Sequence, residues 1–196
     1  LLIELSQQVQ GIRREALVDE LTGIYNRRHF QMELRREIER AARSGRRLVL
    51  SILDIDHFKK YNDTHGHPAG DRALQQIVQV IQANIRDSDT VCRYGGEEFA
   101  VILPDTGSDV PLSREAGVRI LERVRQAVEE QQIDGENSQP GERLTISAGV
   151  GVFNEDADEA DGLIQYADCI LYIAKEQGRN RVVSRPKGYG DAAASA

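Results

Sequence analysis

The stretch Arg93-Tyr94-Gly95-Gly96-Glu97-Glu98-Phe99 lies between two short apolar runs, Thr90 to Tyr94 and Glu98 to Leu103. Both runs are typical of strands, and the glycine pair between them allows a tight turn, so this segment predicts a β-hairpin. The glycines also let a bulky anion approach the backbone, and the carboxylates that follow can hold a divalent metal beside it. The hairpin tip therefore indicates a site for a metal-bound phosphate.

The elements on either side of the hairpin predict the fold class. Leu48 to Leu53 reads as a buried strand that ends on Asp54, and Leu144 to Phe153 reads as another strand. Helices are predicted over residues 26–43, 70–85, 113–132 and 160–177, and a last short strand over residues 181–184. The core order is strand, helix, strand, strand, helix, strand. This order predicts an α+β fold, a ferredoxin-like βαββαβ core with added helices and strands, in which helices flank a central antiparallel sheet.

Composition limits the kinds of protein this chain can be. Its 196 residues, 40% apolar and 29% charged, fit one soluble globular domain with a short appendage. The net charge of −7 argues against a nucleic-acid partner, and no apolar run approaches the roughly 18 residues that cross a bilayer. Cys92 and Cys169 form neither a disulfide framework nor a zinc motif, so we expect a reducing, cytoplasmic compartment.

The two ends of the chain are predicted to lie outside the domain. Apolar residues near the start are spaced as in the seam of a coiled coil: Leu2, Leu5, Val9, Ile12 and Ala16. Residues 1–18 therefore predict a helix that either packs on its own domain or forms a dimerising stalk. Residues 185–196 predict a frayed tail. Because the chain opens on Leu1, we expect a fragment of a longer protein whose upstream sensor, and any membrane anchor, precede it.

Asp54 and Glu97 are candidates for a shared metal site. Asp54 stands where a buried strand leaves the sheet, and Glu97 lies in the hairpin predicted on a neighbouring strand. If these strands pair, the two carboxylates converge, and Mg²⁺ commonly takes one or two carboxylates together with substrate phosphates. The alternative is that Asp54 caps the next turn while the glutamates are solvated.

The segment from Asp54 to Asp63 and its continuation carry candidate nucleotide-binding groups. Lys59 can neutralise phosphate charge, and backbone N–H groups of the turn can cradle a phosphate. Asn62 and Asp71 can hydrogen-bond a base. An aspartate accepts from N1–H and N2–H of guanine together, whereas N1 of adenine is itself an acceptor, so guanine is preferred. The alternative role for Asp71 is a helix N-cap.

Two cations near the end of the last predicted helix have two possible roles. Lys175 and Arg179 lie four residues apart there. They either stabilise the negative end of the helix dipole or point into the phosphate pocket from the opposite side. The second role depends on the metal and nucleotide residues described above.

Several segments together resemble the GGDEF family of diguanylate cyclases. Residues 95–99 are the GGEEF form of the family signature, and residues 19–28 are similar to the family's opening. Residues 54–63 and 66–71 are similar to its nucleotide segment, and residues 174–180 to its closing helix. Several motifs in the right order are more specific than a glycine pair alone. The resemblance covers about residues 19–184 and implies a nucleotidyl-cyclase-like GGDEF domain.

The resemblance implies the condensation of two GTP molecules to cyclic di-GMP, with release of two pyrophosphates. Each of two facing domains would hold one GTP, and the ribose 3′-hydroxyl of one nucleotide would attack the α-phosphate of the other. A homodimer is then part of catalysis. The physical task is phosphoryl transfer, in which a metal and cations offset charge on the phosphate oxygens.

The resemblance also implies roles for particular residues. Asp54, the main-chain carbonyl of Ile55 and Glu97 would bind Mg²⁺ or Mn²⁺, with Glu98 as a further ligand. Glu97, the catalytic candidate together with Glu98, would take the 3′-hydroxyl proton. The implied substrate-binding residues are Phe58, Lys59, Gly95 and Gly96 near the phosphates, Asn62 and Asp71 at guanine, and Lys175 and Arg179 at the triphosphate end.

Arg86-Asp87-Ser88-Asp89, shortly before the hairpin tip, resembles the RxxD inhibitory site of the family. Arg86 can bond guanine O6 and N7, and Asp89 can accept from N1–H and N2–H, so the product cyclic di-GMP is expected to bind and inhibit there. Arg123 is a supporting arginine by the same resemblance. The alternative is an arginine at a helix C-terminus followed by a loop acid.

Three functions remain open on the sequence alone. An active cyclase is favoured because the signature, both metal acids and the closing cations Lys175 and Arg179 are all present. The alternative is a catalytically silent module that binds GTP or cyclic di-GMP and regulates a partner. Another nucleotidyl cyclase is disfavoured by the guanine-suited pair Asn62 and Asp71. No membrane contact is expected of this fragment.

Overall fold

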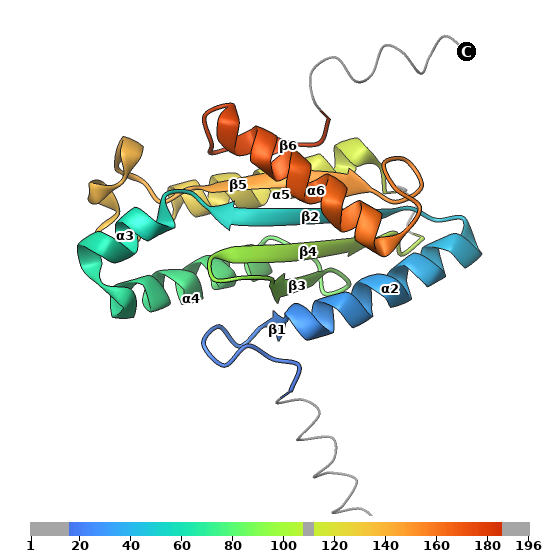
Figure 1. Cartoon of the computed structure of the whole chain (residues 1–196), viewed down its shortest axis with the longest axis horizontal. Coiled ribbons are helices and arrows are strands. Elements are labelled where there is room, and N and C mark those ends of the chain that lie inside the picture. Colours follow the sequence, from blue (N-terminus) through green and yellow to red (C-terminus); the bar gives the residue numbers. More distant parts are fainter. Residues whose placement is uncertain (1–15, 108–111, 186–196) are drawn as a thin grey trace, which may run out of the picture.

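The computed structural model describes residues 16–107 and 112–185, which form a six-stranded sheet between two layers of helices (Figure 1). The strands are β1 (Tyr25–Asn26), β2 (Leu48–Ile55), β3 (Thr90–Arg93), β4 (Glu98–Pro104), β5 (Ile146–Val152) and β6 (Val182–Val183). Their order across the sheet is β1-β3-β4-β2-β5-β6. The four central strands pair antiparallel, whereas the two-residue edge strands run parallel to their neighbours. The predicted ferredoxin-like core with added strands is confirmed.

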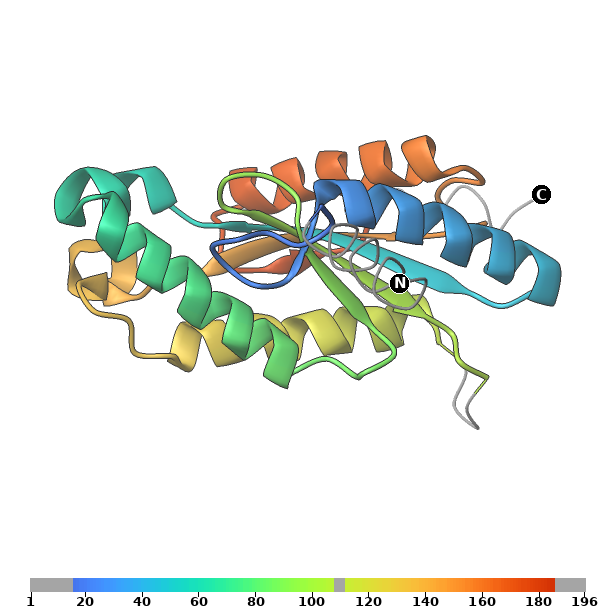
Figure 2. The same cartoon turned by 90° about the horizontal axis from the view of Figure 1, so that it is seen from below.

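Helices cover both faces of this sheet. They are α2 (Arg27–Ser44), α3 (Phe58–His65), α4 (His67–Ala83), α5 (Arg114–Glu130) and α6 (Ala160–Glu176), with short 3₁₀ turns η1 (Glu136–Ser138) and η2 (Pro140–Glu142). Figure 2 shows α2 and α6 on one face and α4 and α5 on the other. Each layer encloses its own apolar core, one around Phe30 and Leu163 and the other around Ile77 and Val124. Because β2 is buried along its whole length, its sequence is almost continuously apolar.

Local signals in the sequence set the ends of α2. The Asn26 side chain accepts hydrogen bonds from the backbone N–H groups of Arg28 and His29, as an N-cap does. The helix ends at Gly45, which adopts the left-handed conformation with φ of 65°. The helix thus ends three residues before β2, which lies between β4 and β5 in the sheet.

The segment after β2 differs from the prediction. The sequence pattern predicts a helix from residue 70 and none before it, but residues 58–65 form α3 and α4 already begins at His67. Phe58 and Tyr61, one helical turn apart, are buried in the core and hold α3 in place. Gly66, with φ of 80°, separates the two helices. The link is thus a helical hairpin beside the end of β2.

The predicted ends of the chain stay largely untested. Residues 1–15 and 186–196 lie outside the described residues, so the predicted N-terminal helix and the frayed tail remain predictions. Of residues 16–18, Val18 forms a bridge to Tyr25 and none is helical. No helix within the described ranges is both long and apolar enough to span a membrane.

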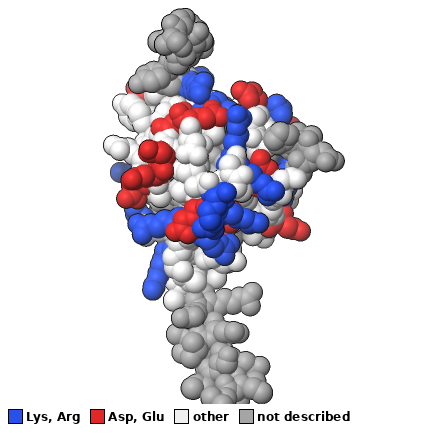
Figure 3. Space-filling model, turned by 90° about the vertical axis from the view of Figure 1, so that its right-hand side faces the viewer, with Lys and Arg blue, Asp and Glu red and all other residues white. Residues whose placement is uncertain are grey.

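Charged side chains crowd the end of the molecule shown in Figure 3, where α2 ends and β2 begins. Arginines of α2 pair with glutamates of the same helix, as Arg40 does with Glu37 and Arg43 with Glu39. Arg47 pairs with Glu155. Glu37 is buried, but Arg43 and Glu39 are both exposed, and an exposed pair of this kind contributes less than about 1 kcal/mol.

Candidate active site

The ends of β2 and β4 bring the predicted metal residues together. The two strands pair antiparallel, and their register places Asp54 opposite Glu98. The backbone N–H of Ile55 donates to the carbonyl of Glu97 at 3.3 Å. The strand pairing on which the predicted site depends is therefore present, at the end of the sheet next to α3.

The environment of Asp54 changes its acidity. Burial is the main cause that raises the pKa of Asp54 to about 6, and the negative charges of Glu97 and Glu98 raise it further. The ammonium of Lys175, 2.8 Å from Oδ2 of Asp54, opposes the rise. Asp54 is thus paired with Lys175 and lies within the electrostatic reach of two further carboxylates. The alternative in which Asp54 only caps a turn does not account for this arrangement.

The donor chemistry suits a hard divalent cation. Within residues 16–107 and 112–185, no cluster of three or more His, Cys, Asp or Glu side chains is preformed to hold a metal ion. Magnesium sites need fewer protein ligands, because the ion keeps several waters and takes oxygens from substrate phosphates. One or two carboxylates with an excess of negative charge around them match that requirement.

The hairpin tip is shaped by the close approach of Glu98. Backbone N–H groups of Tyr94 and Gly95 donate to the carbonyl of Glu98, at 2.8 and 3.1 Å. A Cβ at residue 95 would lie 2.4 Å from Oε2 of Glu98, whereas one at Gly96 would meet nothing. Neither glycine takes a positive φ. Glycine is needed at position 95 for space, and the open side of Gly96 leaves room for a large ligand.

Arg93 joins the hairpin tip to the N-terminal loop. Its Nη1 lies 3.0 and 3.2 Å from the two carboxylate oxygens of Asp19, while Nε and Nη2 donate to the carbonyl of Gly96 at 3.2 and 2.8 Å. Asp19 also accepts from the backbone N–H and hydroxyl of Thr22. Sequence reasoning missed this link. The available signals were an arginine next to the glycine pair and an Asp-x-x-Thr loop.

The N-terminus of α3 faces the candidate site from the end of β2. Its N-cap residue, His57, adopts the left-handed conformation with φ of 57° and provides no side-chain cap. The first N–H groups of a helix have no partner within the helix and can bind an anion. Lys59 is exposed, but the Phe58 side chain is only 4% exposed and belongs to the core. Phe58 can therefore meet a phosphate through its backbone only.

The side chain of Asn62 on α3 packs against Gly70 of α4. Its Oδ1 is buried and has no hydrogen-bond partner among the described residues. A Cβ at Gly70 would fall 1.9 Å from this oxygen, so this close packing requires glycine. An unpaired buried acceptor costs about 1–3 kcal/mol, which a ligand N–H would recover. An amide oxygen is a hydrogen-bond acceptor, which matches the N–H donors of guanine.

Asp71 follows Gly70 and is exposed on α4. The helix begins at His67 and its N-cap position is Gly66, so Asp71 is more than a turn inside the helix. The alternative role of Asp71 as an N-cap is therefore wrong. Its carboxylate remains available for a ligand.

The two closing cations are placed differently from each other. Lys175 is on α6, on the face of the sheet opposite α4 and α5, and its ammonium reaches Asp54 (Figure 2). Arg179 lies beyond the helix with φ of 63°, and its Nη1 is 3.5 Å from the carbonyl of Lys175. Lys175 thus points into the site as expected, while Arg179 also meets the negative helix end, its alternative role.

Asp56 is a buried structural acid beside the site. Only 3% exposed, it accepts from the hydroxyls of Thr145 and Ser147, both at 2.7 Å. It also accepts from the backbone N–H of Asn180 at 3.0 Å. These bonds hold β5 and the turn after α6 against the end of β2. Its position two residues after Asp54 does not by itself reveal this structural role.

The RxxD segment forms a closed turn at the end of α4. The backbone N–H of Arg86 donates to Oδ2 of Asp89, and the N–H of Asp89 donates to the carbonyl of Arg86, both at 2.9 Å. Arg123 donates to the carbonyl of Asn84 at 2.6 Å. Burial raises the pKa of Asp89, and the charges of Arg86 and Arg123 oppose the rise. The structure brings all three predicted residues together.

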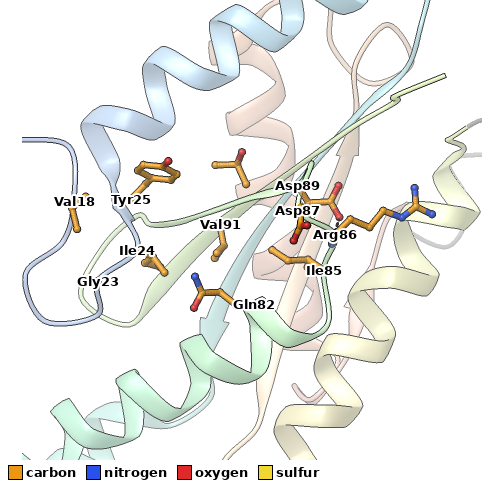
Figure 4. A pocket seen from close by; sticks show the side chains of 11 residues that line it. Val18, Gly23, Ile24, Tyr25, Gln82, Ile85, Arg86, Asp87, Asp89 and Val91 are labelled. Atoms are coloured by element: carbon orange, nitrogen blue, oxygen red, sulfur yellow. Dashed lines mark hydrogen bonds between the residues drawn. The ribbon is translucent and has the colours of Figure 1, made fainter. Parts of the chain in front are cut away.

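A pocket of about 390 Å³ opens beside this turn, between residues 23–25, the end of α4 and the start of β3 (Figure 4). In Figure 4 the Arg86 side chain points toward α5 and away from Gly23 and Tyr25. The pocket and the guanidinium thus lie on different sides of the turn. The turn is separated from the hairpin tip by the length of β3.

A βαββαβ sheet with carboxylates at the adjoining ends of its central strands defines a nucleotidyl-cyclase-like domain. The diguanylate cyclase GGDEF domain matches residues 16–181. The chain belongs to this family.

Curated relatives share about two fifths of its sequence. Diguanylate cyclase DosC of Escherichia coli K12 is 41% identical over 182 residues, which cover 93% of this chain and 37% of that protein. Response regulator PleD of Caulobacter vibrioides is 39% identical over 170 residues, covering 87% and 36%. The chain thus spans little more than a third of the length of these relatives.

Solved structures of other family members have the same fold. The coiled coil and GGDEF domain of DgcB from Caulobacter crescentus, in complex with c-di-GMP, gives a TM-score of 0.82 at 31% identity and covers 94% of this chain and 93% of that one. The active GGEEF domain of a diguanylate cyclase from Vibrio cholerae gives 0.73 at 30% identity, covering 83% and 97%.

Proposed function

We propose that this chain is the catalytic domain of a diguanylate cyclase, which condenses two GTP molecules into cyclic di-GMP and two pyrophosphates. One observation carries the proposal: Asp54 is buried at the end of β2, opposite Glu98 of the glycine hairpin, and its Oδ2 lies 2.8 Å from the ammonium of Lys175. A receptor that only binds nucleotide has no need of such a concentration of acids. Family membership supports the same activity.

Asp54, the carbonyl of Ile55 and Glu97, with Glu98 nearby, are the groups that would hold Mg²⁺ or Mn²⁺. Their excess negative charge at a buried position is the fit that supports this assignment. A divalent cation bound there would supply charge neutralisation for the triphosphate. Lys175 would then be released from Asp54 toward the phosphates.

The nucleotide is proposed to lie across the end of the sheet. The unpaired Oδ1 of Asn62 and the exposed carboxylate of Asp71 would accept from the guanine N–H groups. Backbone N–H groups at the start of α3, with Lys59, Gly95 and Gly96, would surround the phosphates, because a helix N-terminus favours anions. Arg179 would meet the triphosphate from the turn after α6.

The reaction requires two such domains facing each other. Glu97 of one domain would accept the 3′-hydroxyl proton, the hydroxyl oxygen would attack the α-phosphorus of the GTP in the second domain, and the bond to pyrophosphate would break. An interface that holds both GTP molecules in place removes the entropy cost of bringing two free substrates together. Specific activity is therefore expected to rise with protein concentration in dilute solution.

The experiment is incubation of the purified chain with GTP and Mg²⁺, with chromatography of the products. We expect the wild type to form cyclic di-GMP and pyrophosphate. The turnover rate of Glu97→Gln should be lower by at least about a hundredfold, since a general base contributes about that much. The matched control is Glu130→Gln, at an exposed position at the end of α5, and its turnover rate should equal that of the wild type.

Two outcomes would contradict the proposal in different ways. GTP that is bound but not consumed, even at high protein concentration, would indicate a silent binding module. Wild-type turnover in Glu97→Gln, with unchanged circular dichroism, would refute the role of Glu97 alone.

The RxxD turn is proposed as a site of product feedback. Arg86 and Asp89 carry the groups that pair with guanine, and Arg123 lies near enough to affect the pKa of Asp89. The relative DgcB was solved in complex with c-di-GMP, so a GGDEF domain of this fold can bind that compound. In this chain the same product would bind at the RxxD turn and inhibit the cyclase reaction.

A further inference from the structure

Two successive residues after α6 take an unfavourable backbone conformation. Arg179 and Asn180 have φ of 63° and 46°, in the left-handed region. This region costs non-glycine residues about 1–2 kcal/mol each, although asparagine tolerates it better than most. A turn of this kind persists when contacts outside the turn hold it. In this protein the turn carries Arg179, a proposed triphosphate ligand.

Asn180 is held by partners from two other elements. Its backbone N–H donates to Oδ2 of Asp56 at 3.0 Å, just beyond the end of β2. Its side chain is bonded to α5: Nδ2 donates to Oε1 of Glu129 at 2.8 Å, and Oδ1 accepts from Nη1 of Arg125 at 2.6 Å. Both ends of the amide are therefore satisfied, and the side chain has one orientation.

The partners on α5 are themselves fixed. Arg125 is 9% exposed and donates from Nη1 to Glu129 at 2.6 Å and from Nε to Glu122 at 2.8 Å. A buried guanidinium needs such pairing, because leaving it unpaired costs several kcal/mol. The network connects α5, which contributes none of the proposed ligands of GTP or metal, to the turn that follows the last helix.

We propose that Asn180 is a positioning residue of the cyclase site. Together with Arg125 and Glu129 it holds the left-handed turn and so sets the Arg179 guanidinium where it meets the triphosphate. This inference rests on the proposed function, and it adds α5 to the parts of the protein on which nucleotide affinity depends.

The decisive variant is Asn180→Gly. Glycine adopts the left-handed conformation without strain and keeps the N–H that donates to Asp56, so the variant removes only the two side-chain bonds to α5. The matched control is Asn154→Gly. Asn154 is also left-handed, with φ of 64°, but it is exposed in the turn after β5 and is not one of the proposed site residues.

The first readout is binding, by calorimetry, of a non-hydrolysable GTP analogue and of GMP in Mg²⁺. We expect Asn180→Gly to lower the affinity for the analogue about tenfold, equivalent to about 1.4 kcal/mol. Its affinity for GMP should be unchanged, because GMP lacks the outer phosphates. Asn154→Gly should change neither. Equal weakening of both ligands would indicate a general structural lesion and overturn the inference.

The second readout is a double-mutant cycle with Arg179→Ala. If Asn180 acts through Arg179, Asn180→Gly has no further effect on analogue affinity once the guanidinium is gone. Additive losses would show that Asn180 acts independently of Arg179 and would contradict the proposal.

The third readout does not depend on GTP. Amide hydrogen exchange over residues 178–181 should be about tenfold faster in Asn180→Gly than in the wild type, because the turn opens locally when its side-chain bonds are lost. Unchanged exchange overturns the inference whether or not the chain binds GTP. A wild-type chain that binds no GTP overturns the proposed function, whereas wild-type affinity in Asn180→Gly overturns the inference alone.

Discussion

At the scale of single residues, the ionised carboxylate of Asp54 is expected to lower the free energy of unfolding of the metal-free protein at neutral pH. Burial first, and the charges of Glu97 and Glu98 next, raise its pKa from 3.8 to about 6 despite Lys175. A carboxyl whose pKa is raised by folding binds its proton more tightly in the folded state. The associated stability is present below about pH 4 and is lost as the pH rises through about 6, at a cost of the order of 3 kcal/mol.

Asp54→Asn should therefore stabilise the metal-free protein. We expect its free energy of unfolding in urea and EDTA to exceed that of the wild type by about 2–3 kcal/mol near pH 8, and by little near pH 4. Asp63→Asn, at an exposed position on α3, is the control and should have no such effect. A stabilisation that is equal at the two pH values would show that the ionisation of Asp54 is not its cause.

Mg²⁺ provides the complementary observation at the same residue. Because a cation favours the ionised carboxylate, added Mg²⁺ should stabilise the wild type more near pH 8 than near pH 5. The Asn variant should lose most of this response.

At the scale of elements, α6 packs directly on the backbone of β5. A Cβ at Gly149 would lie 2.2 Å from the carbonyl oxygen of Ala167 and 2.3 Å from the backbone nitrogen of Leu171, whereas one at Gly151 would lie 3.0 Å from a methyl group of Leu163. Backbone atoms of a helix cannot move aside individually, but a leucine side chain can rotate.

Gly149→Ala should accordingly destabilise the protein far more than Gly151→Ala. We expect about 3 kcal/mol or more for the first and about 1 kcal/mol for the second, measured by urea unfolding. Since α6 carries Lys175, Gly149→Ala should also lower activity under conditions in which the variant is still folded. Similar losses in the two variants would show that α6 adjusts its position easily.

Helices and strands with a regular apolar pattern could be predicted from the sequence. A helix with few buried apolar residues could not. β2, α2 and the hairpin follow from unbroken apolar runs, a cap residue and a glycine pair. α3 does not, because Phe58 and Tyr61 are its only buried residues among eight. The bonds from Asn180 to Arg125 and Glu129 join residues more than 50 positions apart, and no local pattern marks such pairs.

The candidate site was predictable for a related reason. Asp54 and the glutamates of the hairpin stand at the ends of strands that were easy to recognise, so their meeting required only that those strands pair. The roles of Asp56 and Arg93 depend on which partners the tertiary fold supplies, and the sequence does not specify those partners.

At the scale of the whole molecule, the RxxD turn and the hairpin tip lie at opposite ends of β3. Product bound at the turn of one domain would therefore act by holding two domains apart or in a wrong orientation, and not by blocking its own site. Inhibition of this kind changes assembly, while the catalytic groups stay intact.

Arg86→Ala should relieve inhibition by cyclic di-GMP without changing the initial rate. We expect the concentration for half inhibition to rise by about tenfold or more, since a bidentate arginine contact to guanine is worth about 1–3 kcal/mol. Arg119→Ala, at an exposed position on α5, is the control. Unchanged inhibition in Arg86→Ala would remove the turn from the regulatory proposal.

Both borders of the described sheet consist of strands only two residues long, β1 and β6. A strand from a neighbouring molecule that tried to extend the sheet would find very few backbone groups to pair with, and long exposed borders are what fibril growth requires. Concentrated solutions of the folded domain are therefore expected to resist cross-β aggregation, so that losses on storage would begin with unfolding.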